Sequence, residues 1–111
     1  MITLCIRYTI VPNKLTDFQK YAKSELDVIR RNGGGSPSFF YPTDFAGPTS
    51  EALGLIDFET LSAYERYRGR LANDPSHERH ARTLVDSGVI RCMNRSILER
   101  AESAIPHELQ G

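Results

Sequence analysis

Apolar and polar side chains alternate over residues 2–10, and this period of two in a segment rich in β-branched residues predicts a strand. Pro12 ends the strand, because proline has no N–H to donate to a ladder. Apolar residues then recur at steps of three and four, which predicts an amphipathic helix over about 14–31 with Asn13 as its N-cap. Gly33 suits the left-handed position that follows a helix.

The pattern after this helix predicts further strands and two helical segments. Thr60 or Ser62 is expected to cap the first segment, and Asp74 and Pro75 are expected to cap and open the second, which Gly88 ends. The strands are expected at 38–41, 51–58 and 89–98, with a loop that contains proline and glycine at 42–50.

The resulting order is strand, helix, strand, strand, helix, strand. With right-handed crossovers it predicts an α+β fold, a ferredoxin-like βαββαβ sandwich with antiparallel strands in the spatial order 4-1-3-2 and helices on one face. A chain of 111 residues holds one such domain, expected over 1–98. Residues 99–111 are charged, contain Pro106 and show no period, so we expect a C-terminal tail that orders only on a partner.

The sheet face away from the helices is also expected to be apolar. Strand 38–41 has aromatic residues on both faces, and strand 51–58 places Leu53 and Leu55 opposite Ile56. Large apolar patches seldom stay exposed, so the pattern predicts a homodimer in which a second copy of the sheet covers this face. The alternative is a monomer with a partly apolar sheet.

Charge and cysteine content narrow the classes of function. Fourteen Lys and Arg residues balance fourteen Asp and Glu residues, which argues against nucleic-acid binding and against attachment to membranes by charge. No apolar run has the length of a membrane span, and the first residues do not resemble a signal peptide. We therefore expect a cytoplasmic protein whose cysteines, Cys5 and Cys92, stay reduced. The glycine run 33–35 lacks the surrounding residues of a nucleotide-binding motif, so no cofactor is expected.

Arg7 is the first candidate for chemistry, because an arginine in the middle of a central strand must be paired or reach an anion. One interpretation is an ion pair with Asp57, expected at the matching end of the third strand, which is taken here as a parallel neighbour of the first. The other is a clamp that presents a planar guanidinium to a carboxylate or enolate. Arg91 or Arg95 on the last strand is expected to add a second positive charge.

Tyrosine hydroxyls can orient a phenol or a carbonyl at a cleft, and plain core packing is the alternative for Tyr8, Tyr41, Tyr64 and Tyr67. Tyr8 is best placed for a cleft between sheet and helices, because it lies on the helix side of the first strand. Arg7 and Tyr8 are the catalytic candidates. The predicted ligand-binding residues are Arg7, Tyr8, Tyr41, Asp57, Tyr64 and Arg91.

His77 and His80 lie three residues apart on one helical face, with Asp74 three residues before His77. Two imidazoles and a carboxylate at this spacing can hold a metal ion. The surrounding segment, HERHAR, is strongly charged and is typical of a solvated face. We therefore expect no metal site here.

Several segments together resemble the NIPSNAP family. They are the strand with Arg7-Tyr8, the Pro12 turn and the long first helix, the run Phe39-Phe40-Tyr41, the helix Leu61-Ser62-Ala63-Tyr64-Glu65-Arg66-Tyr67-Arg68, the step Asn73-Asp74-Pro75, and the closing Arg95-Ser96-Ile97-Leu98. The resemblance covers about 1–98. It implies a dimeric α/β-barrel fold, which is shared with small cofactor-free monooxygenases.

The resemblance and the candidate residues lead to two hypotheses. The first is a homodimeric small-molecule-binding protein, a cofactor-free monooxygenase or isomerase for an aromatic or polyketide-like compound, with Arg7 stabilising a developing enolate. The alternative is a non-catalytic scaffold or protein-interaction module whose tail docks to a partner. A deep cavity between sheet and helices, lined by Tyr and Arg, favours the first hypothesis, and an interior filled with Leu and Phe favours the second.

Overall fold

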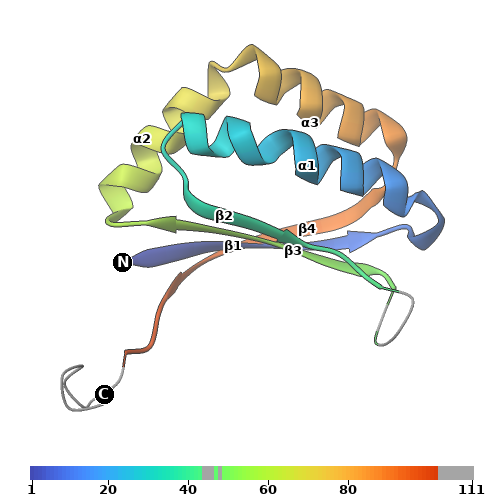
Figure 1. The fold of residues 1–111 in the computed structure, drawn as a ribbon, viewed down its shortest axis with the longest axis horizontal. Coiled ribbons are helices and arrows are strands. Elements are labelled where there is room, and N and C mark those ends of the chain that lie inside the picture. The colour runs from blue at the N-terminus through green and yellow to red at the C-terminus, as the bar shows by residue number, and fades with distance from the viewer. Residues whose placement is uncertain (44–46, 48, 103–111) are drawn as a thin grey trace.

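The computed structural model describes residues 1–43, 47 and 49–102, which form a four-stranded sheet and a layer of helices on one of its faces (Figure 1). The elements follow the predicted order, so the ferredoxin-like α+β fold is confirmed. Their bounds are β1 Ile2–Ile10, the 3-10 turn η1 Pro12–Lys14, α1 Leu15–Arg31, β2 Gly35–Phe40, β3 Glu51–Phe58, α2 Leu61–Ala72, α3 Pro75–Ser87 and β4 Ile90–Glu99. None of these helices is long and apolar enough to cross a membrane.

β1 lies inside the sheet, whose order is β2-β3-β1-β4, with each neighbouring pair antiparallel. This is the predicted order 4-1-3-2 counted from the other edge. The register pairs Ile6 with Gly54 on β3 and with Arg95 on β4. β4 forms one edge, and a bulge shifts its pairing with β1 between Thr9 and Ile10.

The helix ends follow the predicted signals except at the start of α1, and Gly33 after α1 has the expected positive φ. Thr60 caps α2 through its side chain, Asp74 caps α3 in the same way, and Gly88 adopts the left-handed conformation at the end of α3. The prediction of Asn13 as an N-cap is wrong. The η1 turn leads directly into α1, and Lys14 holds the cap position without a side-chain hydrogen bond.

Two strands differ from their predicted bounds. β2 begins at Gly35, because its backbone already pairs with Asp57 there before the register shifts toward Ser38, and Tyr41 lies beyond its end. β4 begins and ends one residue later than predicted. The predicted loop at 42–50 and the tail at 99–111 fall partly on residues 44–46, 48 and 103–111, which lie outside the described residues.

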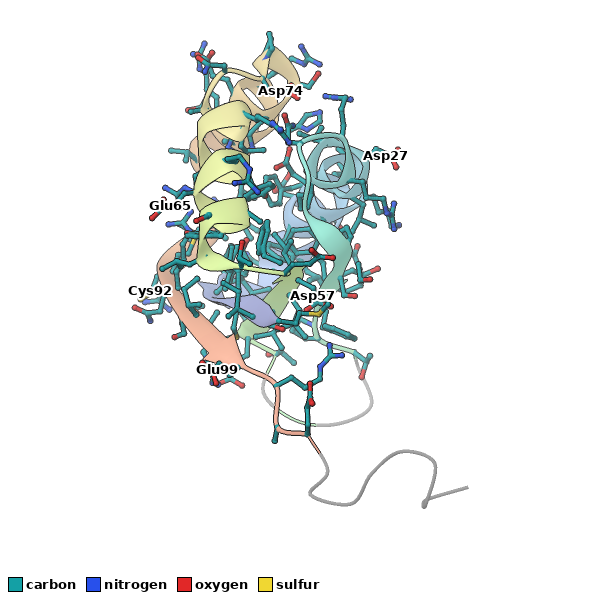
Figure 2. The ribbon with its side chains drawn as sticks, turned by 90° about the vertical axis from the view of Figure 1, so that its left-hand side faces the viewer. Asp27, Asp57, Glu65, Asp74, Cys92 and Glu99 are labelled. Carbon is teal, nitrogen blue, oxygen red and sulfur yellow. The ribbon has the colours of Figure 1, made fainter. Side chains whose placement is uncertain are left out.

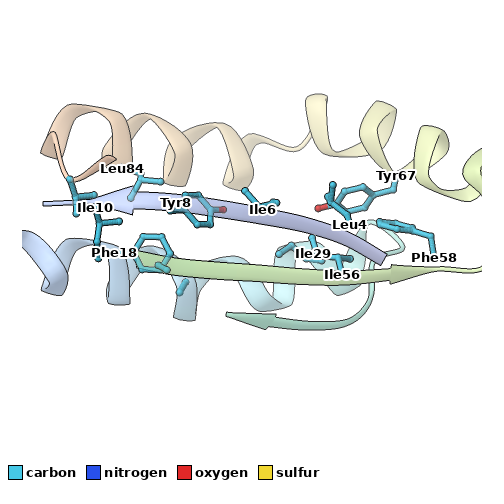
Figure 3. Close-up of a cluster of buried hydrophobic side chains, with 13 residues drawn as sticks. Leu4, Ile6, Tyr8, Ile10, Phe18, Ile29, Ile56, Phe58, Tyr67 and Leu84 are labelled. Atoms are coloured by element: carbon cyan, nitrogen blue, oxygen red, sulfur yellow. The ribbon is translucent and has the colours of Figure 1, made fainter. Parts of the chain in front are cut away.

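The core lies between the sheet and the helices (Figure 3). Alternation along β1 turns its apolar side chains toward the helices, and the Phe18 ring of α1 packs edge-on against Tyr8 at 5.0 Å between centroids. Leu84 of α3 is buried, whereas Val85, which the sequence places on the same inner face, is 73% exposed. The buried cluster is Leu4, Ile6, Tyr8, Ile10, Phe18, Ala22, Ile29, Ala52, Ile56, Phe58, Tyr67, Leu84 and Val89.

The opposite side of the sheet, which we call the open face, is not covered by any helix of the described chain (Figure 1). The register places Phe40, Leu53, Arg7 and Asn94 in one row across this face. Phe40 is more than half exposed, and Leu53 and its neighbour Leu55 are half-buried. The open face therefore combines an apolar strip over β2 and β3 with polar groups over β1 and β4.

Candidate functional site

A cavity of about 290 Å³ lies between the helix-facing side of the sheet and the helices, and we call it the sheet–helix cavity. Its walls are mainly aliphatic and aromatic side chains of the core. Polar groups enter it from all three α-helices and from β1 and β4. These polar lining residues are Tyr8, Tyr21, Glu25, Tyr67, Arg68, His77 and Arg95.

Glu25 places a carboxylate in this apolar interior. Helical steps of three and four put it on the buried side of α1, between Ala22 and Ile29, and it is 1% exposed. A buried carboxylate is costly unless it is hydrogen-bonded. Glu25 has two such partners from α3, with His77 Nδ1 2.8 Å from Oε2 and His80 Nδ1 2.9 Å from Oε1.

The two histidines face α1 because they are three residues apart on the inner side of α3. Their side chains are 26% and 22% exposed, so the predicted solvated face is wrong for His77 and His80. It holds for Glu78 and Arg82 on the outer side, which form an exposed ion pair. An ionised carboxylate only accepts hydrogen bonds, so each Nδ1 must carry a hydrogen when Glu25 is charged.

Asp74 fixes the start of α3 against the end of α1. Its carboxylate accepts hydrogen bonds from Arg31 Nη2 at 2.9 Å and Asn32 Nδ2 at 2.8 Å, and its side chain is 10% exposed. The hydrogen bonds from Asn32 and then Arg31 hold the pKa of Asp74 well below its usual range. Figure 2 shows Asp74 in the helical layer, at the end far from the sheet. This joint keeps His77 and His80 opposite Glu25.

Tyrosine hydroxyls from three elements lie near the carboxylate. Tyr8 of β1 and Tyr21 of α1 share a hydrogen bond, and Tyr67 comes from α2. Figure 3 shows the hydroxyls of Tyr8 and Tyr67 directed toward each other, with Ile6 between them. Burial raises the pKa of Tyr8 to about 12 and raises the pKa of Tyr21 and Tyr67 well above 10, and the charge of Glu25 adds to each rise. All three hydroxyls therefore keep their hydrogens at neutral pH.

Positive charge lies at the rim of the cavity. Arg95 sits opposite Ile6 on the helix-facing side of β4, and its charge partly offsets the rise in the pKa of Tyr8. Arg68 of α2 donates a hydrogen bond to the Tyr64 hydroxyl at 3.3 Å. Both arginines are exposed, so the negative group of the cavity is buried and the positive groups meet solvent.

The structure separates the predicted ligand-binding residues into different places. Tyr8 lines the sheet–helix cavity, as expected for its side of β1. Arg7 and Tyr41 line a different hollow of about 440 Å³ on the open face, together with Glu51 and Asn94. Arg7 is exposed there, whereas an arginine in a central strand covered on both faces would be buried.

The predicted ion pair between Arg7 and Asp57 is wrong. β1 and β3 are antiparallel, so Arg7 lies opposite Leu53 and Asp57 lies opposite Thr3, four residues away along β1. Asp57 accepts a hydrogen bond from Thr3 Oγ1 at 2.7 Å and forms an ion pair with Arg100, whose Nη2 lies 3.4 Å from the carboxylate. Its role is thus to tie the end of the sheet to the residue that follows β4.

Tyr64 and Arg91 lie outside the sheet–helix cavity. The Tyr64 ring packs edge-on against Phe58 at 5.3 Å between centroids, which is the packing role that the sequence left as its alternative. Arg91 is exposed on β4 at the bulge, whereas Arg95, the other arginine expected on this strand, reaches the cavity.

The sequence indicates His77 and His80 only as a candidate metal site that it then sets aside, and it does not indicate Glu25, the central group of the site. A signal for it exists, because Glu25 occupies a position of the apolar stripe of α1, and His77 and His80 share helical spacing with Leu84. The sequence does not show that the two stripes face each other. In the described part of the chain, no group of three or more His, Cys, Asp or Glu side chains is arranged to hold a metal ion.

Comparisons with known proteins agree with this architecture. The NIPSNAP family model matches residues 3–104. The fold is similar to a NIPSNAP family protein with unknown function from Agrobacterium tumefaciens, with 19% identity, 91% of this chain and 88% of that chain covered, and a TM-score of 0.77. It is also similar to an uncharacterized NIPSNAP-like domain protein from Burkholderia xenovorans, with 24% identity, 95% and 89% covered, and a TM-score of 0.74.

A more distant similarity is to a putative antibiotic biosynthesis monooxygenase from Nitrosomonas europaea, with 10% identity, 92% of this chain and 100% of that chain covered, and a TM-score of 0.70. A search of curated proteins found no match. At these identities the solved structures show similarity of fold alone, and they do not indicate which chemistry the cavity supports.

Proposed function

This chain belongs to the NIPSNAP family, and from that membership and the sheet–helix cavity we propose that it is a homodimer in which each protomer binds one small molecule. The ligand has an aromatic or polyketide-like body and a hydroxyl or carbonyl group. It lies between the sheet and the helices, with its body against the apolar walls and its polar group near Glu25 and the tyrosine hydroxyls.

The observation that carries this proposal is a hydrogen-bonded carboxylate on the wall of an apolar cavity. Glu25 is almost completely buried, yet it lines the hollow and does not fill it. Small-molecule sites have this composition, with mostly apolar walls and a few placed polar groups. The volume of about 290 Å³ lies at the lower end of the range for such sites, which favours a compact ligand.

The same observation favours binding over the alternative of a non-catalytic scaffold. A scaffold needs no polar groups between its layers, and an interior of closely packed Leu and Phe is the usual way to stabilise one. Here tyrosine, glutamate, histidine and arginine side chains from five elements converge on one hollow. The tail expected to dock to a partner lies mostly outside the described residues.

The homodimer is supported by the open face. Phe40, Leu53 and Leu55 form an apolar strip that the helices leave uncovered. Cys5 of β1 lies opposite Leu55 of β3. β4 is exposed along almost its whole length. A second copy of the sheet, related by a two-fold axis, covers such a strip with the same strip and so needs no other partner.

Binding is tested with 2-naphthol, a flat aromatic phenol whose hydroxyl can donate to Glu25. Isothermal titration is expected to give one site per protomer in the unmodified protein. Ala81→Phe places a ring in the cavity wall and is expected to weaken binding at least about tenfold. Ala101→Phe, the same change at an exposed residue beyond β4, is expected to leave the affinity unchanged.

Either of two results contradicts the proposal. One is the absence of measurable heat of binding with 2-naphthol at millimolar concentration. The other is equal affinity in the Ala81→Phe and Ala101→Phe variants, which places the ligand somewhere other than the sheet–helix cavity.

A further inference from the structure

We propose that Glu25 is the catalytic base of an isomerase, and that its substrate is a neutral ketone with an aryl ring and an acidic hydrogen on the carbon next to the carbonyl group. The inference rests on the proposed function, because the ketone must first bind in the sheet–helix cavity. It goes further by assigning a reaction, a base and a class of substrate.

The carboxylate of Glu25 has the accessibility that a base needs. A carboxylate offers about four lone-pair positions on its two oxygens. The Nδ1 atoms of His77 and His80 occupy one position on each oxygen, at 2.8 and 2.9 Å. One position on each oxygen remains, and the residue lines the cavity, so a bound molecule can present a hydrogen to it.

The two histidines act as positioning residues. Hydrogen bonds from α3 to both oxygens fix the plane of the carboxylate, which α1 alone would leave free to rotate about its side-chain bonds. The joint between Asp74 and Arg31 holds the two helices together at the same end. A base fixed in this way loses no rotational freedom when the substrate arrives.

Hydroxyl groups lie where the oxygen of an enolate needs donors. Tyr8 and Tyr67 project toward each other across Ile6 (Figure 3). Arg95 pairs with Ile6 in the register and so lies on the same side of the sheet as Tyr8. Glu25 and both tyrosines line the same cavity, and the charge of Glu25 contributes to the raised pKa of each tyrosine. Protonated donors held in a dry cavity are effective stabilisers of a developing oxyanion.

The reaction needs no oxidant, reductant or second substrate. Glu25 takes the hydrogen as a proton, so the C–H bond breaks, an O–H bond forms on the carboxyl group, and the electron pair moves onto the carbonyl oxygen. The enolate oxygen accepts hydrogen bonds from Tyr8 or Tyr67. In a substrate with a double bond next to the α-carbon, the enolate is a dienolate, and Glu25 returns the proton to its far carbon. The double bond thereby moves into conjugation with the re-formed carbonyl group, and the carboxylate is restored.

The walls of the cavity set the class of substrate. Aliphatic and aromatic side chains favour an uncharged, flat body, and a volume of about 290 Å³ suits a compact ring system. A free carboxylate on the substrate would be buried beside Glu25, and two like charges in an apolar cavity repel each other. We therefore infer a neutral ketone and not a keto acid.

The experiment follows exchange of the two C1 hydrogens of 2-tetralone with deuterium in D2O by proton NMR. The proton that Glu25 takes up is replaced by deuterium from the solvent at the rim of the cavity before it returns to carbon. 2-Tetralone is a neutral bicyclic ketone whose C1 α-carbon is bonded to the aromatic ring, and 2-naphthol has a shape close to that of its enol. The full-length protein is expected to accelerate this exchange, and 2-naphthol is expected to inhibit it. One of the two hydrogens on C1 is expected to exchange faster than the other. Selective removal is the signature of a bound base and needs no variant.

Glu25→Gln is expected to slow the catalysed exchange by about 100-fold or more, because a positioned general base contributes on that scale. Binding of 2-naphthol is measured in the same sample and is expected to persist. Glu65→Gln, the same change on the exposed side of α2, is the matched control and is expected to exchange like the unmodified protein (Figure 2).

A second pair of variants separates positioning from plain structure. His80→Asn keeps an N–H close to the place of Nδ1, whereas His80→Leu removes it. We expect the exchange rate at saturation to be largely retained in the first and to fall at least about tenfold in the second, with similar binding of 2-naphthol in both. A role limited to holding the helices would change stability and leave the exchange rate of the folded protein unaltered.

The outcomes separate the two proposals. If 2-naphthol binds but exchange is no faster than with Glu25→Gln, or shows no preference between the two hydrogens, then the assignment of Glu25 is wrong and the binding site stands. If 2-naphthol does not bind, both proposals fail. If Glu25→Gln does not fold, the selectivity of the unmodified protein and the two His80 variants decide.

Discussion

Burial changes the acidity of Tyr8 more than any charge near it does. The pKa of its hydroxyl is raised to about 12, with desolvation as the largest cause; Arg95 and the hydrogen bond with Tyr21 lower this pKa, and Glu25 raises it. Tyr8 is placed for this by one step of alternation along β1, since Arg7 before it and Thr9 after it face the open side. The first consequence is a donor that remains protonated at every physiological pH.

The second consequence is a loss of stability in alkali. A group whose folded pKa is raised stabilises the fold fully below its unfolded pKa, near 10, and this contribution is lost as pH rises through about 12. We expect the free energy of unfolding of the unmodified protein to fall steeply between about pH 10 and 12. In Tyr8→Phe this fall is expected to be smaller by about 2–3 kcal/mol. Urea unfolding from pH 9 to 12 measures it. Parallel pH profiles for the two proteins would contradict the assignment.

At the scale of elements, the joint between α1 and α3 determines the geometry of the site. Asp74 lies between α2 and α3 and is the N-cap of α3. Its carboxylate also binds Arg31 and Asn32 at the end of α1. His77 and His80 follow within two turns of the same helix and reach Glu25. α2 contributes less, because Tyr67 is its single buried residue. The carboxylate is therefore held by a pair of helices and not by the sheet.

This joint predicts a dependence of stability on acid. The lowered pKa of Asp74 means that its contribution is present above the ordinary value near 4 and is lost as pH falls through the lower folded value. Asp74→Asn keeps an acceptor at the cap but removes the charge. We expect this variant to unfold at lower urea than the unmodified protein at pH 7, and the difference to shrink steadily below pH 4. Asp27→Asn, a change at an exposed residue of α1, is the control, and a difference for Asp74→Asn that is constant with pH would contradict the prediction.

At the scale of the whole molecule, the helices cover one face of the sheet and leave the other face uncovered. The open face holds the apolar strip Phe40, Leu53 and Leu55, and next to it the hollow lined by Arg7 and Tyr41. If two copies pack through the strip, the exposed Arg7 becomes buried between them. The clamp that the sequence suggests for Arg7 then belongs to the interface and not to the sheet–helix cavity.

A charge placed in the strip tests the dimer. We expect sedimentation at about 10 µM to give twice the monomer mass for the unmodified protein, and the monomer mass for Leu55→Glu, because a carboxylate buried between two apolar sheets is strongly unfavourable. Leu61→Glu, which adds the same charge at an exposed residue of α2, is expected to remain a dimer. A monomeric unmodified protein, or a dimeric Leu55→Glu variant, would show that the strip is not the interface.

The sequence predicts this architecture well and its site poorly, for a physical reason. Alternation in β1, the cap at Asp74 and the stop at Gly88 are local signals, and each is confirmed. The site, in contrast, depends on which helix faces pack against each other in the folded protein. Glu25 and His77 are 52 residues apart, and nothing in either helix alone encodes their contact. The error with Arg7 and Asp57 is of the same kind, because the register between β1 and β3 decides it.

The distance along the chain between Glu25 and its two partners also bears on how the protein is made. A ribosome adds about 5–20 residues per second, so α1 emerges several seconds before the histidines that are 52 and 55 positions further on. During that interval the helix cannot bury its stripe without burying an unpaired carboxylate. β1 is likewise complete long before β4, its partner on one side. The paired, buried arrangement around Glu25 can therefore form only after the first turns of α3 have been made.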